Sequence, residues 1–164
     1  MSSDLKAAYR PVIRAVASRL SAYGFVQRGS VLRKQAGMNV ALIEFQLSDK
    51  TTKDRVVFTI NLGVFCGALA GGLSGNPTVM DAHLRKRLGF LLPQGEDKWW
   101  ELTTQTNLAE LGDEISAGLA ERARPFLDEY LDNKALLALW ESGQSPGLTA
   151  GKRAEFLAHL KAAT

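Results

Sequence analysis

Three residue types that can do covalent chemistry occur near the middle of the chain, at Cys66, Asp81 and His83. A thiol with a nearby imidazole and carboxylate is a residue set used in nucleophilic catalysis. Cys66, however, follows an apolar run that predicts a strand, and a cysteine in such a place is typically a small packing residue. We therefore predict no catalytic residues. A hydrolase-like enzyme without a recognisable motif, using Cys66 as nucleophile or Glu44 as acid or base, remains one alternative.

Phosphate and metal chemistry are not indicated by the spacing of the candidate residues. The glycine-rich segment 66–78 contains Gly71 and Gly72, but Leu73 stands where a phosphate-binding loop requires lysine. Its expected role is that of a surface loop. Apart from Cys66, the only nitrogen or sulfur ligands are His83 and His159, and no pair has the spacing of a helical metal site. We expect neither a metal nor another cofactor.

The densest basic group lies between the two candidate sheet regions, and it consists of His83, Arg85, Lys86 and Arg87. Aromatic residues follow it at Phe90 and at Trp99 and Trp100, and basic residues beside aromatics are typical of single-stranded nucleic-acid binding. Residues 1–65 carry a net charge of +6 and residues 66–164 a net charge of −3. The alternative is that these charges form ion pairs within the protein, for example with the Glu96–Asp97 turn.

A polar set on two consecutive predicted strands is the best candidate for a binding site. Alternation places Glu44, Gln46, Thr59 and Asn61 on one face, opposite the apolar side chains of the same strands. We predict a recognition groove formed by this set and rimmed by Arg87 and by Trp99 or Trp100. Because neighbours on a strand point to opposite faces, one tryptophan would belong to the core. The alternative is a solvated sheet face.

The elements that position these residues follow from apolar periodicity. The pattern predicts a helix over 4–23, kinked at Pro11 or starting near it, and strands over 30–35, 40–47 and 56–64. Residues 79–87 fit either a helix or a strand, and short strands are predicted over 88–92 and 99–103. Helices follow from residue 107, with Asn107 as N-cap and a break or kink at Pro125. This order predicts a single α+β domain over 1–164, with an antiparallel sheet of about five strands and helices on one face.

Several segments occur in the order of a known family. They are Gly24–Arg28, Ile43–Ser48, Phe58–Val64, His83–Phe90 and Asp97–Leu102. With the Phe-Thr-Ile-Asn-Leu-Gly and Lys-Trp-Trp elements as the specific parts, the chain resembles the bacterial family called domain of unknown function 4304. The resemblance covers about residues 5–132 and leaves a helical C-terminal extension, 133–164. It implies no activity and no catalytic residue.

Composition limits the remaining choices. The 164 residues include one cysteine, which permits no internal disulfide, and contain no apolar run of the roughly 20 residues needed to span a bilayer. We expect a cytoplasmic protein without membrane contact, as a monomer or weak dimer. The leading hypothesis is a non-enzymatic binding or protein-interaction domain for a protein or small-molecule ligand. A nucleic-acid-binding accessory domain is the alternative.

Overall fold

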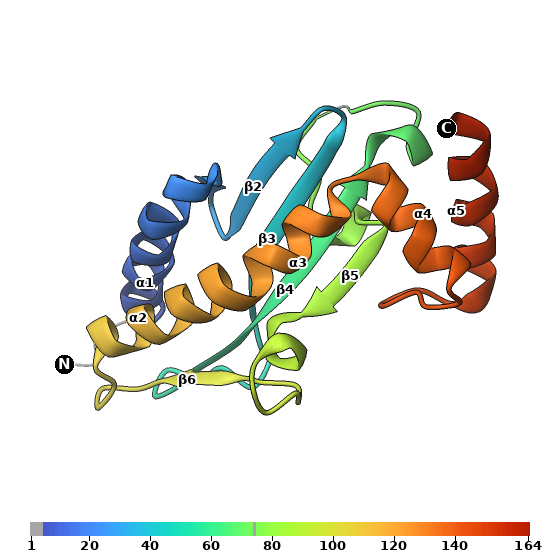
Figure 1. Cartoon of the computed structure of the whole chain (residues 1–164). Helices are drawn as coiled ribbons and strands as arrows, with labels where there is room; N and C mark the ends of the chain where they lie inside the picture. Colours follow the sequence, from blue (N-terminus) through green and yellow to red (C-terminus); the bar gives the residue numbers. More distant parts are fainter. Residues whose placement is uncertain (1–4, 74) are drawn as a thin grey trace.

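The computed structural model describes residues 5–73 and 75–164 as an antiparallel sheet with helices across one face (Figure 1). This confirms the predicted α+β class, although the sheet has six strands where about five were expected. The strands are β1 (Val26–Arg28), β2 (Val31–Ala36), β3 (Asn39–Leu47), β4 (Val56–Cys66), β5 (Leu84–Arg87) and β6 (Trp100–Leu102). The α-helices are α1 (Leu5–Leu20), α2 (Leu108–Gly118), α3 (Arg124–Tyr130), α4 (Asn133–Glu141) and α5 (Ala150–Ala163).

The sheet is built around β4. Strands β1 to β4 form an antiparallel meander, as short connections favour. On its other side β4 pairs with two short strands, β5 along residues 61–64 and β6 along residues 56–58. The chain between them forms a 3₁₀ helix, Leu88–Leu91, where a strand was predicted. Gly89 explains the difference, because a Cβ there would collide with the backbone of Glu96 and Lys98, so the chain must turn tightly here.

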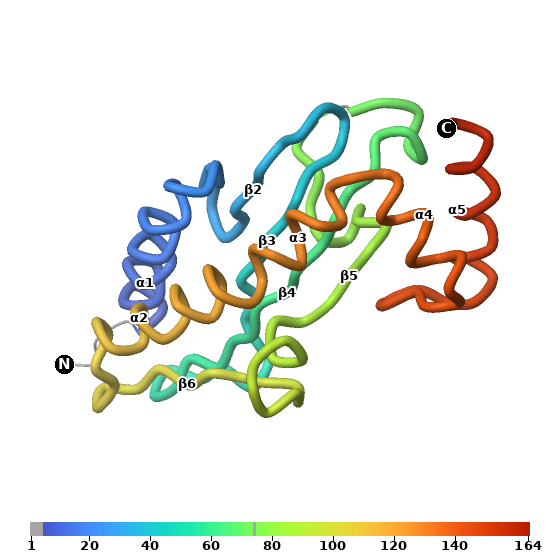
Figure 2. Tube along the Cα trace, viewed as in Figure 1, coloured from blue at the N-terminus to red at the C-terminus, as the bar shows by residue number. Residues whose placement is uncertain are grey.

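The helix layer covers the apolar face of the sheet (Figure 2). Helix α1 contains Pro11, so the helix does not start near this residue. A 3₁₀ turn, Ser21–Tyr23, follows α1 and is capped by Gly24 with φ of 95°. Asn107 accepts a hydrogen bond from the Glu110 N–H, which confirms the predicted cap of α2. A π-helical segment, Leu119–Ala123, joins α2 to α3, and Pro125 lies in the first turn of α3.

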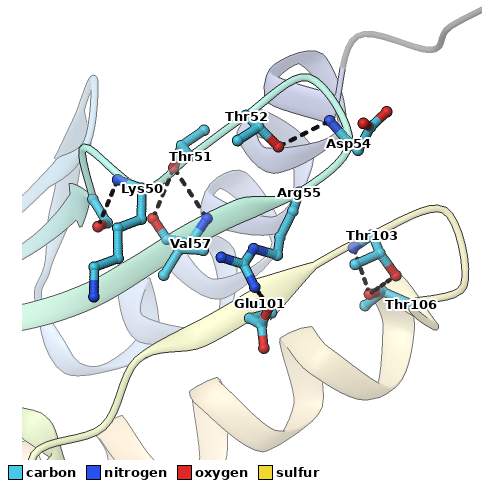
Figure 3. Close-up of polar contacts among 10 residues, drawn as sticks. Lys50, Thr51, Thr52, Asp54, Arg55, Val57, Glu101, Thr103 and Thr106 are labelled. Atoms are coloured by element: carbon cyan, nitrogen blue, oxygen red, sulfur yellow. Dashed lines mark hydrogen bonds and ion pairs between the residues drawn. The ribbon is translucent and has the colours of Figure 1, made fainter.

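Ion pairs join the basic first part of the chain to its acidic remainder. Arg19 pairs with Asp113, and Lys34 lies 2.9 Å from Asp128. Near the turn before β4, Arg55 contacts Glu101 of β6 at 2.9 Å, which ties the two strands together (Figure 3). Part of the charge difference between the two parts of the sequence is therefore neutralised by ion pairs within the protein.

The second face of the sheet is covered only in part. The segment between β4 and β5 folds back over one end of it, and Leu73, Val79 and Ala82 pack there on Leu42 and Phe65. A 3₁₀ helix (Val79–Asp81) followed by Ala82 forms the last part of this cover before β5. The stretch 79–87, for which helix and strand were both open, thus contains a short helical turn and then β5. None of the described helices has the length and apolar character needed to cross a membrane.

Candidate functional site

A groove of about 770 Å³ lies on the second face of the sheet, where the cover formed by Leu73 and residues 79–82 stops. Strands β3, β4 and β5 form its floor. Its sides are the Val79–Met80 turn, Phe90 and the loop at Pro146–Gly147. Its volume is within the roughly 300–1,000 Å³ of small-ligand pockets.

Strand register places three polar residues in one row across the floor. Glu44 of β3 is directly opposite Asn61 of β4, and Asn61 is directly opposite Arg87 of β5. Next to the row, the Asn61 side-chain amide donates to Gln46 Oε1 at 2.6 Å. The structure therefore brings four of the sequence-predicted residues to the groove: Glu44, Gln46, Asn61 and Arg87.

Arg87 is fixed by two neighbours at one end of the groove. Its Nη1 lies 2.6 Å from Asp97 Oδ2, and its guanidinium stacks on the Trp99 ring at 5.0 Å from the ring centroid. The Trp99 indole N–H also donates to Asp97 Oδ2, at 3.3 Å. Arg87, which lines the groove, and Trp99 thus form one stacked unit. The alternative that a basic residue of this group forms an ion pair with the Glu96–Asp97 turn is met by Arg87.

Glu44 has a structural partner and an open side. Its Oε1 accepts the Val79 backbone N–H at 3.1 Å and so holds the end of the cover in place. Arg33, on the neighbouring strand, is near enough for the Glu44 charge to counteract the lowering of the Arg33 pKa by burial. Arg33 itself donates to the Pro77 and Asn76 carbonyls. Among the described residues, no basic nitrogen lies within ion-pair distance of the Glu44 carboxylate.

Arg85 presents a guanidinium that is held by carbonyl oxygens only. Its Nη2 donates to the Met80 carbonyl at 2.7 Å and its Nε to the Ala82 carbonyl at 3.4 Å. No carboxylate of the described chain forms an ion pair with it. A fixed guanidinium with unused N–H groups is a preorganised site for an oxyanion.

Exposed apolar side chains gather at the same place. Met80 is 80% exposed and Phe90 48% exposed, and both line the groove. Trp99, stacked on Arg87, is 37% exposed. Large apolar side chains left in water around a polar concavity are typical of a ligand site.

Two residues of the predicted set are not available to a ligand. Thr59 shares the face of Asn61 but is fully buried, because its hydroxyl donates to the Lys98 carbonyl at 2.7 Å and the 96–98 turn covers it. Trp100 belongs to the core on the opposite face, where it stacks on Phe58 and its indole N–H donates to Glu114.

The predicted basic patch is divided by the fold. His83 is buried, its Nδ1 accepts the Cys66 backbone N–H at 2.9 Å, and burial lowers its pKa to about 4, so it is uncharged. Lys86 points to the helix side, with its ammonium over the Phe126 ring. Since Arg87 is paired with Asp97, Arg85 is the member of this group whose charge faces the groove unpaired.

The geometry does not assemble a nucleophile with its base. Burial raises the pKa of the Cys66 thiol, and the thiol donates to Asn133 Oδ1 at 3.3 Å while the His83 nitrogen is occupied by a backbone N–H. Asp81 caps its own 3₁₀ turn by accepting from the Thr78 N–H. Within the described ranges, no three His, Cys, Asp or Glu side chains are grouped so that they could hold a metal ion.

Sequence reasoning missed several groove residues. Arg85 was assigned to the basic patch, although its i, i+2 spacing from Arg87 on a strand could have placed both on one face. Met80 was not singled out, and Phe90 was considered only as an aromatic residue beside the basic group; both lie in 3₁₀ turns, where strand alternation gives no information about the face. Pro146 and Gly147 reach the groove from far along the chain, and the Arg85 N–H bonds the Pro146 carbonyl at 3.3 Å.

Comparison with known proteins gives a family but no function. Searches of curated proteins and of solved structures each found no significant match. A family model described as a domain of unknown function, DUF4304, matches residues 16–129 and so includes β1 to β6 and every groove residue except Pro146 and Gly147. Because the match covers well over half of the 164 residues, the chain belongs to the DUF4304 family.

Proposed function

We propose that this protein is a non-enzymatic binding domain, and that its ligand site is the groove on the second face of the sheet. One observation carries the proposal: the groove combines unpaired charges at Glu44 and Arg85 with exposed apolar side chains at Met80 and Phe90. Such a combination orients a ligand by its polar groups and retains it by its apolar surface. The absence of an assembled nucleophile and base around Cys66 supports binding over catalysis.

The charge of the groove favours a small ligand over a nucleic acid. A nucleic-acid site needs several cations free to contact phosphates. Here Arg87 is neutralised by Asp97, and Glu44 on β3 places a negative charge on the other side of β4 from Arg85. A polyanion would meet attraction at one side of the groove and repulsion at the other.

The proposal can be tested by screening a fragment library by NMR on the ¹⁵N-labelled protein. The Gln46 and Asn61 side-chain amides lie on the groove floor and give their own signals, so binders should shift these two first. The exposed amide of Gln105, in the turn before α2, serves as the internal control and should not move. If the binders found shift residues elsewhere and leave Gln46 and Asn61 unchanged, the groove is not the site.

A further inference from the structure

The groove is lined by two side chains of opposite charge, Glu44 and Arg85. Glu44 is on β3 and Arg85 is on β5, with β4 between them and an offset of two residues along the strands. With strands about 4.8 Å apart and about 3.4 Å per residue, their backbones are about 12 Å apart. Both charged groups contact the Val79–Ala82 segment, Glu44 at the Val79 N–H and Arg85 at the Met80 and Ala82 carbonyls. A ligand that satisfies both must carry an anionic and a cationic group some 10 Å apart or less.

The floor next to Glu44 offers an amide-like pair of hydrogen-bonding groups, with Asn61 on the neighbouring strand and Gln46 two residues further along β3, on the side away from Arg85. Asn61 uses its Nδ2 on Gln46 Oε1, which leaves Asn61 Oδ1 as an acceptor and Gln46 Nε2 as a donor without a partner in the described chain. A peptide unit has the complementary N–H and C=O groups, and each residue of the ligand backbone repeats them.

Resting on the proposed function, we propose that the groove binds a short linear peptide of two or three residues with free ends. Its carboxylate binds the Arg85 guanidinium, its ammonium binds the open side of Glu44, and its backbone passes over Asn61, with Gln46 beside the amino end. An extended tripeptide spans about 10 Å at 3.3–3.6 Å per residue and a dipeptide less, so both lengths are within the upper limit set by the backbone spacing. Met80 and Phe90 provide apolar surface for its side chains.

Each end of the peptide would bind a side chain whose conformation is already fixed by hydrogen bonds. Arg85 is held by the Met80 and Ala82 carbonyls, and Glu44 by the Val79 N–H, so little side-chain entropy is lost on binding. The unpaired charges exclude a simple apolar ligand, because its binding would desolvate both without compensation.

The test uses the tripeptide leucyl-alanyl-phenylalanine in three forms: with free ends, C-terminally amidated, and N-terminally acetylated. Titration of the intact protein, by calorimetry and by NMR, should show that either modification weakens binding at least tenfold. Arg85→Gln should abolish the difference between the free and amidated forms. Glu44→Gln should abolish the difference between the free and acetylated forms. Arg14→Gln, an exposed arginine on α1, is the matched control and should bind like the wild type.

Each other outcome overturns a different statement. If the three forms bind equally, or if Arg85→Gln and Glu44→Gln leave the discrimination intact, the peptide assignment is wrong. If no form binds while small fragments still shift Gln46 and Asn61, the peptide assignment fails and the groove remains the binding site. If neither peptide nor fragment shifts the groove signals, the proposed function fails as well.

Discussion

Gly63, buried on β4 beside the groove, is a position where one added methyl group should disturb the packing on the second face of the sheet. It lies on β4 between Leu42 and Arg85, and the end of the cover passes directly over it. A Cβ built on Gly63 would be 2.8 Å from the Ala82 Cβ and 3.3 Å from the Leu84 carbonyl oxygen. The first distance is about 0.6 Å less than the 3.4 Å at which ordinary contact begins.

Because the neighbours are a backbone oxygen and a short side chain, they cannot rotate away. Forcing a methyl group into such a site costs typically about 1–3 kcal/mol. With a urea m-value of about 2 kcal/mol/M, Gly63→Ala should lower the unfolding midpoint by about 1 M. Gly112→Ala is the matched control, since Gly112 is a buried glycine in α2 whose added Cβ would meet nothing within 4 Å. It should raise stability by about 0.5–1 kcal/mol through helix propensity.

The assay is urea unfolding followed by circular dichroism, with the double variant Gly63→Ala/Ala82→Gly as the decisive sample. Removing the Ala82 methyl should recover a coupling energy of about 1 kcal/mol relative to the sum of the single variants. The packing argument is wrong if Gly63→Ala leaves the midpoint unchanged, or if the double variant shows no recovery.

Three further predictions concern the buried groups and the C-terminal loop. The pKa of His83, about 4, is below that of an unfolded chain, so its contribution to stability should be complete above pH 6.5 and be lost towards pH 4, by at most about 3 kcal/mol. In urea unfolding between these pH values, His83→Asn should show a shallower loss than the wild type; equal slopes would contradict the argument. The Cys66 thiol should react with a thiol reagent only after denaturant is added, and rapid reaction of the native protein would reopen the enzyme hypothesis. Gly147→Ala should destabilise the protein more than Gly143→Ala: both have positive φ, but only at Gly147 would the Cβ meet Arg85, at 2.7 Å. Equal unfolding midpoints for Gly147→Ala and Gly143→Ala would show that the loop at Gly147 can move to accommodate the added methyl group.

The parts of the groove that could be read from the sequence are those fixed by strand alternation. Glu44, Gln46 and Asn61 share a face because antiparallel pairing has a strict period of two, and their strands are long enough to show it. Thr59 has the same period but is sealed by the backbone of the 96–98 turn. Strand alternation specifies the face of the sheet on which a side chain lies, but it does not predict which loop covers that face.

The short elements were less predictable because long-range packing decides them. The segment 88–91 is apolar enough for a strand, yet the close approach of the 96–98 backbone to Gly89 makes it a 3₁₀ helix. The conformation of the segment before β5 likewise decides that His83 is buried against Phe65 and Phe156. Its neighbours in sequence were therefore a poor guide to its charge.

The C-terminal extension completes a site whose floor lies in the family-matched region. Glu44, Asn61 and Arg85 fall within residues 16–129, whereas Pro146 and Gly147 lie outside them. The Pro146 carbonyl accepts the Arg85 N–H at the outer edge of β5, so the loop closes the groove at the side where we place the peptide carboxylate. The loop at Pro146–Gly147 can shift without disturbing the sheet. Glu44 and Arg85 would then still determine which end of the peptide lies at which side of the groove. On this reasoning, a loop shift caused by Gly147→Ala should alter affinity for the tripeptide while preserving its preference for free ends.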